Sequence, residues 1–252
     1  MQEKKSDLAG RFELLAFPNV EQLADEAAEA WLEEIERAWD AGRPHMVALL
    51  GGRVAPRLFS AVVRACAMRG TAFGHVHFFW SDERCVPASD PESNYGLAAR
   101  WLFEPLGIDM SQIHRIPIEL GPVAAAAEAE AELRRVAPIG PCGQPVLDLV
   151  LLGMGEDGHI ASLFPGEPAE LAHAADVFRA VTGPKPPFSR ITMSYAVLAS
   201  ARAAWVLVAG AGKCGALRAS LQQSGYTPLA KLVRQRGATR IYAELRALVG
   251  AA

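Results

Sequence analysis

The chain has 252 residues, of which 51% are hydrophobic, and its formal net charge is -3. A chain of this length can bury one large hydrophobic core or two small ones. Binding of nucleic acid requires clustered Lys and Arg to neutralise phosphates, and this chain shows no such cluster, so we expect no nucleic-acid partner. Small anionic ligands stay possible, because a few local cations are enough to bind them.

The four cysteines are far apart and form neither a C-x-x-C pair nor a metal-binding pattern with histidine. They are typical of the reduced thiols of a cytosolic protein. The first ten residues are polar and charged, and no apolar run approaches the ~20 residues that a membrane span needs. We therefore expect a soluble, cytoplasmic protein that has no membrane partner.

Short apolar runs of strand type alternate with segments of helical periodicity, which is typical of βαβ units and a mostly parallel sheet. The expected strands are Phe12–Ala16, Met46–Leu50, Val76–Trp80, Leu147–Leu152, Phe178–Val181, Ala204–Ala209 and Thr239–Ala243. The expected helices are Val20–Trp39, Ala55–Arg69, Pro122–Val136 and Lys213–Leu221. No linker rich in Pro, Gly or Ser divides the chain. We expect one domain over residues 1–252 with a doubly wound α/β fold, helices on both faces of the sheet, and a ligand site at the carboxyl ends of the strands.

The sequence GMGEDGH at residues 153–159 follows an expected strand and satisfies G-x-G-x-x-G. A dinucleotide-binding turn of this pattern must lead directly into a long helix. Pro165 and Pro168 follow too closely for a long helix to continue through them. The pattern therefore does not predict a dinucleotide cofactor.

The same stretch presents Asp157 and His159 at the carboxyl end of the strand. Histidine is the side chain best suited to proton transfer near neutral pH, with an ordinary pKa of about 6.5. A nearby carboxylate can fix its tautomer and stabilise its charged form. The alternative for an isolated D-G-H sequence is a turn histidine that only caps backbone groups.

Three longer segments make the pattern specific. They are FWSDERCVPASDPESNY at 79–95, DLVLLGMGEDGHIASLFPG at 148–166, and RITMSYAVL at 190–198 followed by GAGKCGAL. In this order they resemble the 6-phosphogluconolactonase family, which shares a superfamily with glucosamine-6-phosphate deaminase. The second segment departs from the lactonase pattern at Ile160, where Thr is more usual.

The resemblance implies hydrolysis of 6-phospho-D-glucono-1,5-lactone to 6-phospho-D-gluconate, a reaction of the oxidative pentose phosphate pathway. His159 would be the general base that activates water, and Asp157 would orient it. The resemblance implies no metal and no organic cofactor. His75 and His77 could share one face of a strand, but no further metal ligands stand out, so we interpret both as structural.

The resemblance also implies a site for the substrate's phosphate. Gly51 and Gly52 precede an expected helix, whose first N–H groups and dipole favour an anion. The other candidate binding residues are Arg53, Asp82, Arg84, Arg190 and Lys213. Relatives commonly have Ser or Thr after the paired glycines, so Arg53 could either bind the phosphate or point into solvent.

One position separates the two branches of the superfamily. The deaminase pattern continues with F-N-E-P, whose carboxylate assists opening of the sugar ring, whereas this chain has Phe164 at the carboxylate position. An acid at the Asp82 position occurs in the deaminase as well and does not discriminate. We expect a lactonase that acts on a small phosphorylated sugar lactone; the alternatives are a deaminase-like isomerase and a non-catalytic sugar-phosphate sensor.

Overall fold

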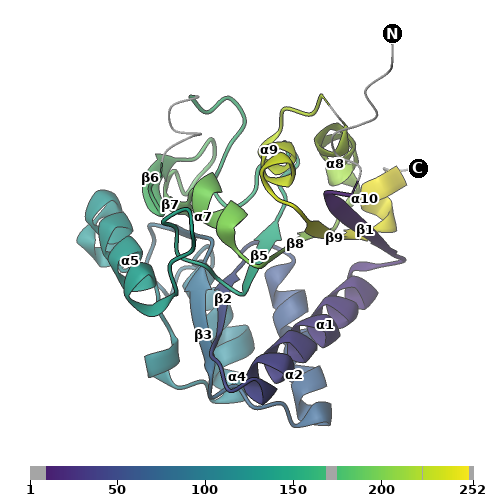
Figure 1. The fold of residues 1–252 in the computed structure, drawn as a ribbon. Helices are drawn as coiled ribbons and strands as arrows, with labels where there is room; N and C mark the ends of the chain where they lie inside the picture. Colours follow the sequence, from purple (N-terminus) through teal and green to yellow (C-terminus); the bar gives the residue numbers. More distant parts are fainter. Residues whose placement is uncertain (1–9, 169–174, 223, 250–252) are drawn as a thin grey trace.

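The structure is a computed structural model that describes residues 10–168, 175–222 and 224–249. Its main sheet contains six strands in the order β1-β9-β8-β5-β2-β3, and every neighbouring pair is parallel (Figure 1). The strands are β1 (Phe12–Phe17), β2 (His45–Leu49), β3 (Val76–Trp80), β5 (Leu149–Gly153), β8 (Ala203–Val208) and β9 (Thr239–Glu244). The expected mostly parallel α/β sheet is thereby confirmed.

The helices lie on both faces of the main sheet. Figure 1 shows α1 (Val20–Asp40) and α2 (Ala55–Arg69) on one face and α7 (Tyr195–Ser200) and α9 (Pro228–Gln235) on the other. The remaining helices are α3 (Asn94–Ala98), α4 (Glu104–Leu106), α5 (Pro122–Val136), α8 (Cys214–Leu221) and α10 (Leu245–Val249). None of the helices in the described ranges is both long and apolar enough to cross a membrane.

Helix α1 illustrates how local sequence sets these elements. The Asn19 side chain accepts a hydrogen bond from the backbone N–H of Gln22 at 2.9 Å and so caps the first turn. Apolar residues then recur at helical spacing, and Leu23, Trp31 and Ile35 are fully buried. The polar face of the helix is left to solvent.

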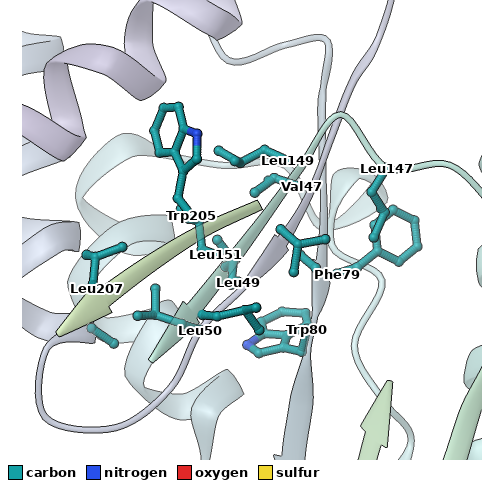
Figure 2. Packing of buried hydrophobic residues seen from close by; sticks show 14 of the residues in the cluster. Val47, Leu49, Leu50, Phe79, Trp80, Leu147, Leu149, Leu151, Trp205 and Leu207 are labelled. Atoms are coloured by element: carbon teal, nitrogen blue, oxygen red, sulfur yellow. The ribbon is translucent and has the colours of Figure 1, made fainter. Parts of the chain in front are cut away.

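The apolar core lies between the sheet and these helices. Strands β2 and β5 are buried along almost their whole length, as expected of central parallel strands that are covered on both faces. Figure 2 shows side chains of these strands packed with Phe79, Trp80 and Trp205. Burial of each large side chain contributes roughly 1.5–3 kcal/mol.

A second, smaller sheet lies beside the first. It is antiparallel, with β4 (Asp82–Arg84), β7 (Ser189–Met193) and β6 (Phe178–Thr182) in this order. The run Phe178–Val181, predicted as a strand of the mostly parallel sheet, belongs to this second sheet. The chain passes from β3 through Ser81 directly into β4, so the polar residues of β4 lie at one end of the main sheet.

The strand order reverses between β2 and β5. From β2 the chain moves outward to β3, and β5 then returns to the other side of β2. Such a reversal leaves a crevice at the carboxyl ends of the two strands. Gly51 and Gly52 follow β2 there, and the loop from Met154 to His159 follows β5.

Candidate active site

A cavity of about 870 Å³ lies at the carboxyl ends of the parallel strands. Its walls come from the ends of β2, β3, β5, β8 and β9 and from the first turn of α2. Seven of the residues predicted from the sequence line it, namely Gly51, Gly52, Arg53, Asp82, Arg84, His159 and Lys213. The chain thus brings together groups that are up to 162 positions apart in the sequence, from Gly51 to Lys213.

His159 lines this cavity and forms a hydrogen-bonded pair with Asp157, which is not part of the cavity wall. The two residues are joined by a contact of 2.6 Å between Nδ1 of His159 and Oδ1 of Asp157. An ionised carboxylate can only accept, so Nδ1 carries the hydrogen, and in the neutral imidazole Nε2 then keeps a lone pair. Burial alone would raise the pKa of Asp157, but the backbone N–H, charge and ring N–H of His159 outweigh it and hold that pKa below its usual value.

The loop fits this pair because Gly155 has no side chain. A Cβ atom at Gly155 would lie 2.0 Å from His159 Nδ1 and 2.5 Å from Asp157 Oδ1. The backbone N–H of Gly155 donates to the carbonyl oxygen of His159 at 2.8 Å, which closes the loop. The second glycine of the motif therefore makes room for the acid–base pair.

The turn after β2 forms a second wall of the cavity. Gly51 is needed there because a Cβ atom would lie 1.8 Å from Oδ1 of the buried Asn94. Gly52 has a φ of +76°, which turns the chain into α2. The backbone N–H of Ala55 donates to the carbonyl oxygen of Gly52 at 3.2 Å, and Pro56 has no N–H, so an anion at this corner would meet the N–H groups of the glycine turn and the positive end of the α2 dipole.

Two cations lie next to the glycine turn. The ammonium group of Lys213 donates to the carbonyl oxygen of Met154. Burial and the charge of Arg53 lower the pKa of Lys213 below its usual value, while Glu156 and Asp157 partly offset them. Arg53 has a side chain that is 87% exposed, and its Nη2 lies 3.4 Å from Glu156 Oε1.

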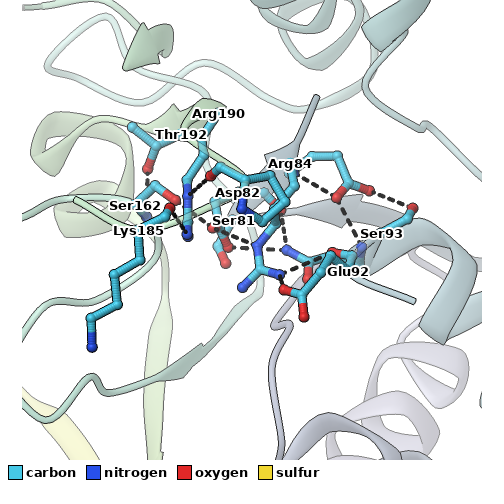
Figure 3. A network of polar contacts seen from close by, with 12 residues as sticks. Ser81, Asp82, Arg84, Glu92, Ser93, Ser162, Lys185, Arg190 and Thr192 are labelled. Atoms are coloured by element: carbon cyan, nitrogen blue, oxygen red, sulfur yellow. Dashed lines mark hydrogen bonds and ion pairs between the residues drawn. The ribbon is translucent and has the colours of Figure 1, made fainter. Parts of the chain in front are cut away.

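A polar network at the start of β4 forms a third wall (Figure 3). Asp82 is buried, and its Oδ2 accepts a hydrogen bond from Ser162 Oγ at 2.7 Å. Nη1 of Arg84 donates to the backbone oxygen and to Oε2 of Glu92, both at 2.9 Å. Asp82 and Arg84 are thereby held with fixed orientation at the edge of the cavity.

Arg190 lies beside this network but does not line the cavity. It pairs with Arg84 across the β4–β7 ladder. Its Nε donates to the carbonyl oxygen of Pro187 at 2.9 Å, and its guanidinium lies 5.6 Å from the ring centroid of Phe164. Burial and the nearby charge of Arg84 lower the pKa of Arg190. Of the predicted binding residues, Arg190 is the one that the structure places outside the cavity wall.

The carboxylate of Glu83 links strand β4 to helix α3. It accepts backbone N–H groups of Arg84, Asn94 and Tyr95 at 2.7, 2.8 and 2.7 Å. It therefore anchors the first turn of α3 to β4, and its contact with Arg84 involves the backbone and not the guanidinium. Burial raises the pKa of Glu83, against the lowering effect of these hydrogen bonds.

Four further charged residues line the cavity without having been predicted from the sequence, and one of them is Glu92, the partner of Arg84. Glu156 lies inside the glycine-rich motif, so the motif itself could have indicated it. Glu244 ends β9, and its Oε2 accepts the backbone N–H of Gly210 at 2.8 Å. Arg57 lies in the first turn of α2 and pairs with Glu21 at 3.5 Å. No local signal in the sequence distinguishes Glu244 or Arg57 from ordinary surface charges.

The other histidines in the described ranges make contacts within the fold. His77 Nδ1 lies 2.9 Å from His114 Nε2, and His114 Nδ1 lies 2.7 Å from Glu132 Oε1. His75 Nε2 lies 3.0 Å from the carbonyl oxygen of Ile35. Within residues 10–168, 175–222 and 224–249, no three His, Cys, Asp or Glu side chains form a group that could hold a metal ion.

Comparison with known proteins gives a consistent set of matches. The family model described as glucosamine-6-phosphate isomerases/6-phosphogluconolactonase matches residues 18–241. The probable chloroplastic 6-phosphogluconolactonase 3 of Oryza sativa subsp. indica is 36% identical over 210 residues, which are 81% of this chain and 64% of that protein. The 6-phosphogluconolactonase of Streptomyces coelicolor is 31% identical over 219 residues, 84% of each chain.

A solved structure is similar over almost the whole chain. The crystal structure of 6-phosphogluconolactonase from Leishmania guyanensis matches with a TM-score of 0.82 and 26% sequence identity, covering 95% of this chain and 98% of that one.

Proposed function

Because the chain belongs to the family of glucosamine-6-phosphate isomerases and 6-phosphogluconolactonases, we propose that it hydrolyses 6-phospho-D-glucono-1,5-lactone to 6-phospho-D-gluconate. The main support is that His159, held by Asp157, lines the same cavity as the glycine turn and Lys213. A base and an anion site that line one cavity suit a substrate that carries both an ester and a phosphate.

His159 performs the proton transfers of this proposal. Its Nε2 takes a proton from water as the water oxygen attacks the lactone carbonyl carbon. The tetrahedral intermediate then collapses, the bond from the carbonyl carbon to the ring oxygen breaks, and the imidazolium returns the proton to that oxygen. Asp157 keeps Nδ1 protonated and stabilises the imidazolium through the 2.6 Å contact. This sequence needs no metal ion and no organic cofactor.

The phosphate binds at the start of α2 in this proposal. Backbone N–H groups of Gly51 and Gly52 and the helix dipole attract it, and Lys213 adds a charged donor from the opposite loop. The sugar end of the substrate then faces Asp82 and Arg84, which line the cavity, and Arg190 supports the wall behind them. Arg84 and Arg190 are restrained by hydrogen bonds to Glu92 and to the carbonyl oxygen of Pro187, which suits orienting the substrate more than capturing its phosphate.

Phe164 favours the lactonase over the deaminase branch. Its ring lies 4.9 Å from the His159 ring, at the position where the deaminase pattern has the carboxylate for ring opening. An aromatic ring cannot donate or accept a proton, so the step that the deaminase requires has no group to perform it. His159 in turn argues against a sensor that only binds sugar phosphates.

A single assay tests the proposed function. The lactone is generated in situ from glucose 6-phosphate, and its hydrolysis is followed above the spontaneous rate. We expect enzyme-dependent hydrolysis that persists after exhaustive treatment with EDTA, and no ammonia from glucosamine 6-phosphate. Hydrolysis at the spontaneous rate would refute the proposal, and ammonia release at a comparable rate would assign the chain to the deaminase branch.

We also propose a cytoplasmic location, in line with the polar first ten residues and the dispersed cysteines. The rice relative carries the word chloroplastic in its name, so location varies within the family. Cell fractionation with an antibody to the chain tests the location, and recovery in an organelle or membrane fraction would contradict it.

A further inference from the structure

Glu156 occupies the corner of the cavity where the phosphate is proposed to bind. It lines the cavity together with the glycine turn and Lys213. Its Oε1 lies 3.4 Å from Nη2 of Arg53, and its side chain is 61% exposed. The carboxylate thus lies at the cavity wall and is largely exposed to solvent.

The same carboxylate lies against the loop that carries Lys213. A Cβ atom at Gly212 would lie 2.9 Å from Glu156 Oε1 and 3.0 Å from its Cδ. Gly212 therefore leaves room for the carboxylate beside the backbone. The negative charge of Glu156 partly offsets the lowering of the pKa of Lys213 by burial and by Arg53. One anion therefore already lies among Arg53, Lys213 and the Gly212 backbone.

We propose that the Glu156 carboxylate is an internal anion that competes with the substrate's phosphate for Arg53 and Lys213, and thereby sets the affinity of the site for phosphorylated ligands. This inference rests on the proposed function, because it needs the phosphate at this corner. In the free protein Glu156 neutralises the corner. When a phosphorylated ligand arrives, the carboxylate must move away or be held beside a second anion.

The exposure of the pair determines the size of the effect. Ion pairs between exposed side chains are worth little, so the phosphate can displace Glu156 at small cost. Repulsion between the remaining carboxylate and a phosphate dianion persists, and it weakens as salt screens exposed charges. We expect removal of the charge to raise the affinity about threefold to tenfold at low salt, with a smaller gain at high salt.

The test measures the dissociation constant of 6-phosphogluconate by calorimetry for the wild-type protein, Glu156→Gln and a control. Glu21→Gln is the matched control, because Glu21 is also exposed and pairs with an arginine of the cavity, Arg57. We expect Glu156→Gln, but not Glu21→Gln, to bind 6-phosphogluconate more tightly than the wild-type protein, by about threefold to tenfold in low salt. The gain should shrink in Arg53→Ala, which removes one of the cations that Glu156 neutralises. Binding of unphosphorylated gluconate should be unchanged.

An unchanged or weaker affinity in Glu156→Gln would overturn the inference. An equal gain in Glu21→Gln, or an equal gain for gluconate, would also overturn it, because the effect would then not involve the phosphate corner. The lactone assay keeps the two proposals apart. If the wild-type protein hydrolyses the lactone and Glu156→Gln binds 6-phosphogluconate with unchanged affinity, only the proposed role of Glu156 is refuted. If the wild-type protein does not hydrolyse the lactone but Glu156→Gln binds 6-phosphogluconate more tightly, the lactonase activity is refuted and the competition by Glu156 stands.

Discussion

His159 is the residue on which the proposed chemistry depends. We predict that His159→Ala lowers kcat by about 100-fold or more, the usual contribution of a general base. The KM should change little, because the proposed phosphate contacts lie on another wall of the cavity. Turnover of the in situ lactone by the purified variant is the measurement.

The control for this variant is His75→Ala, since His75 lies just before the amino end of β3 and contacts the carbonyl oxygen of Ile35. It should keep normal turnover. A His159→Ala protein that folds normally by circular dichroism and still turns over near the wild-type rate would contradict the assignment of the base.

A variant of Arg53 tests whether its guanidinium group belongs to the phosphate site. If Arg53 contacts the phosphate, Arg53→Ala should raise the KM for the 6-phosphorylated lactone by about tenfold, or about 1.4 kcal/mol. An unphosphorylated lactone should be hydrolysed with an unchanged KM. An unchanged KM for both substrates, next to a large increase for Lys213→Ala, would place the Arg53 side chain in solvent.

At the residue scale, the sequence predicted best what is local. Asp157 and His159 are two positions apart, so their contact follows from the motif itself. The contact between Asp82 and Ser162 spans 80 positions, and only the fold brings the two together. Arg190 shows the same limit: its position in a matched segment did not reveal that its guanidinium is hydrogen bonded to Pro187 outside the cavity wall.

At the scale of elements, the loop after β5 must stay compact to hold the acid–base pair. We predict that Gly155→Ala lowers kcat by at least tenfold while the protein stays folded, because the new Cβ atom would lie 2.0 Å from His159 Nδ1. Gly74→Ala is the matched control, since no atom lies within 4 Å of a Cβ there. Equal turnover in both variants would show that the loop can rearrange without loss of the pair.

The link between β4 and α3 gives a pH-dependent prediction. Both oxygens of the Glu83 carboxyl group can accept hydrogen bonds in either protonation state, whereas a glutamine keeps only one acceptor oxygen for the three backbone donors, so Glu83→Gln should reduce the free energy of unfolding by about 2–3 kcal/mol. Burial places the pKa of Glu83 above its ordinary value of 4.5 in the folded protein. Its contribution to stability is therefore fully present below pH 4.5 and is lost as the pH rises through the folded pKa.

Urea unfolding from pH 4.5 to 8 checks this sign. The gap in unfolding free energy between the wild-type protein and Glu83→Gln should be widest at the acidic end and should narrow as the pH rises. The exposed Glu104 provides the control, because Glu104→Gln should leave stability almost unchanged. A gap that widens toward alkaline pH would contradict the assignment.

The central strands were predictable because they are apolar along their length. Strand β4 was missed because its three residues, Asp82 to Arg84, are polar and carry functional groups. Helix α9 was also missed, although Thr227 caps it and Pro228 is its first residue, a combination that is typical of a helix start. Strand β6 was predicted with nearly correct bounds, but the sequence does not specify which sheet a strand joins.

At the scale of the whole molecule, the candidate site depends on strand order. The glycine turn follows β2 and the acid–base loop follows β5, and they meet only because these strands are neighbours in the sheet. The sequence predicted the parallel sheet, and with it the general place of the site. It did not predict Glu244 or Arg57, because a charged side chain at a strand end or in a first helical turn is ordinary in sequence.

The arrangement of the core supports the proposal of a single domain and leads to a test of it. One buried apolar cluster includes Trp31 of α1, Trp80 of β3 and Trp205 of β8, together with Phe178 and Ile191 of the second sheet. We therefore expect one cooperative unfolding transition, with tryptophan fluorescence and far-ultraviolet circular dichroism changing together. Product at about 100 times its dissociation constant should stabilise the whole transition by about 2.7 kcal/mol. Two transitions, of which only one responds to 6-phosphogluconate, would show that the sheets unfold independently and that the chain is not one domain.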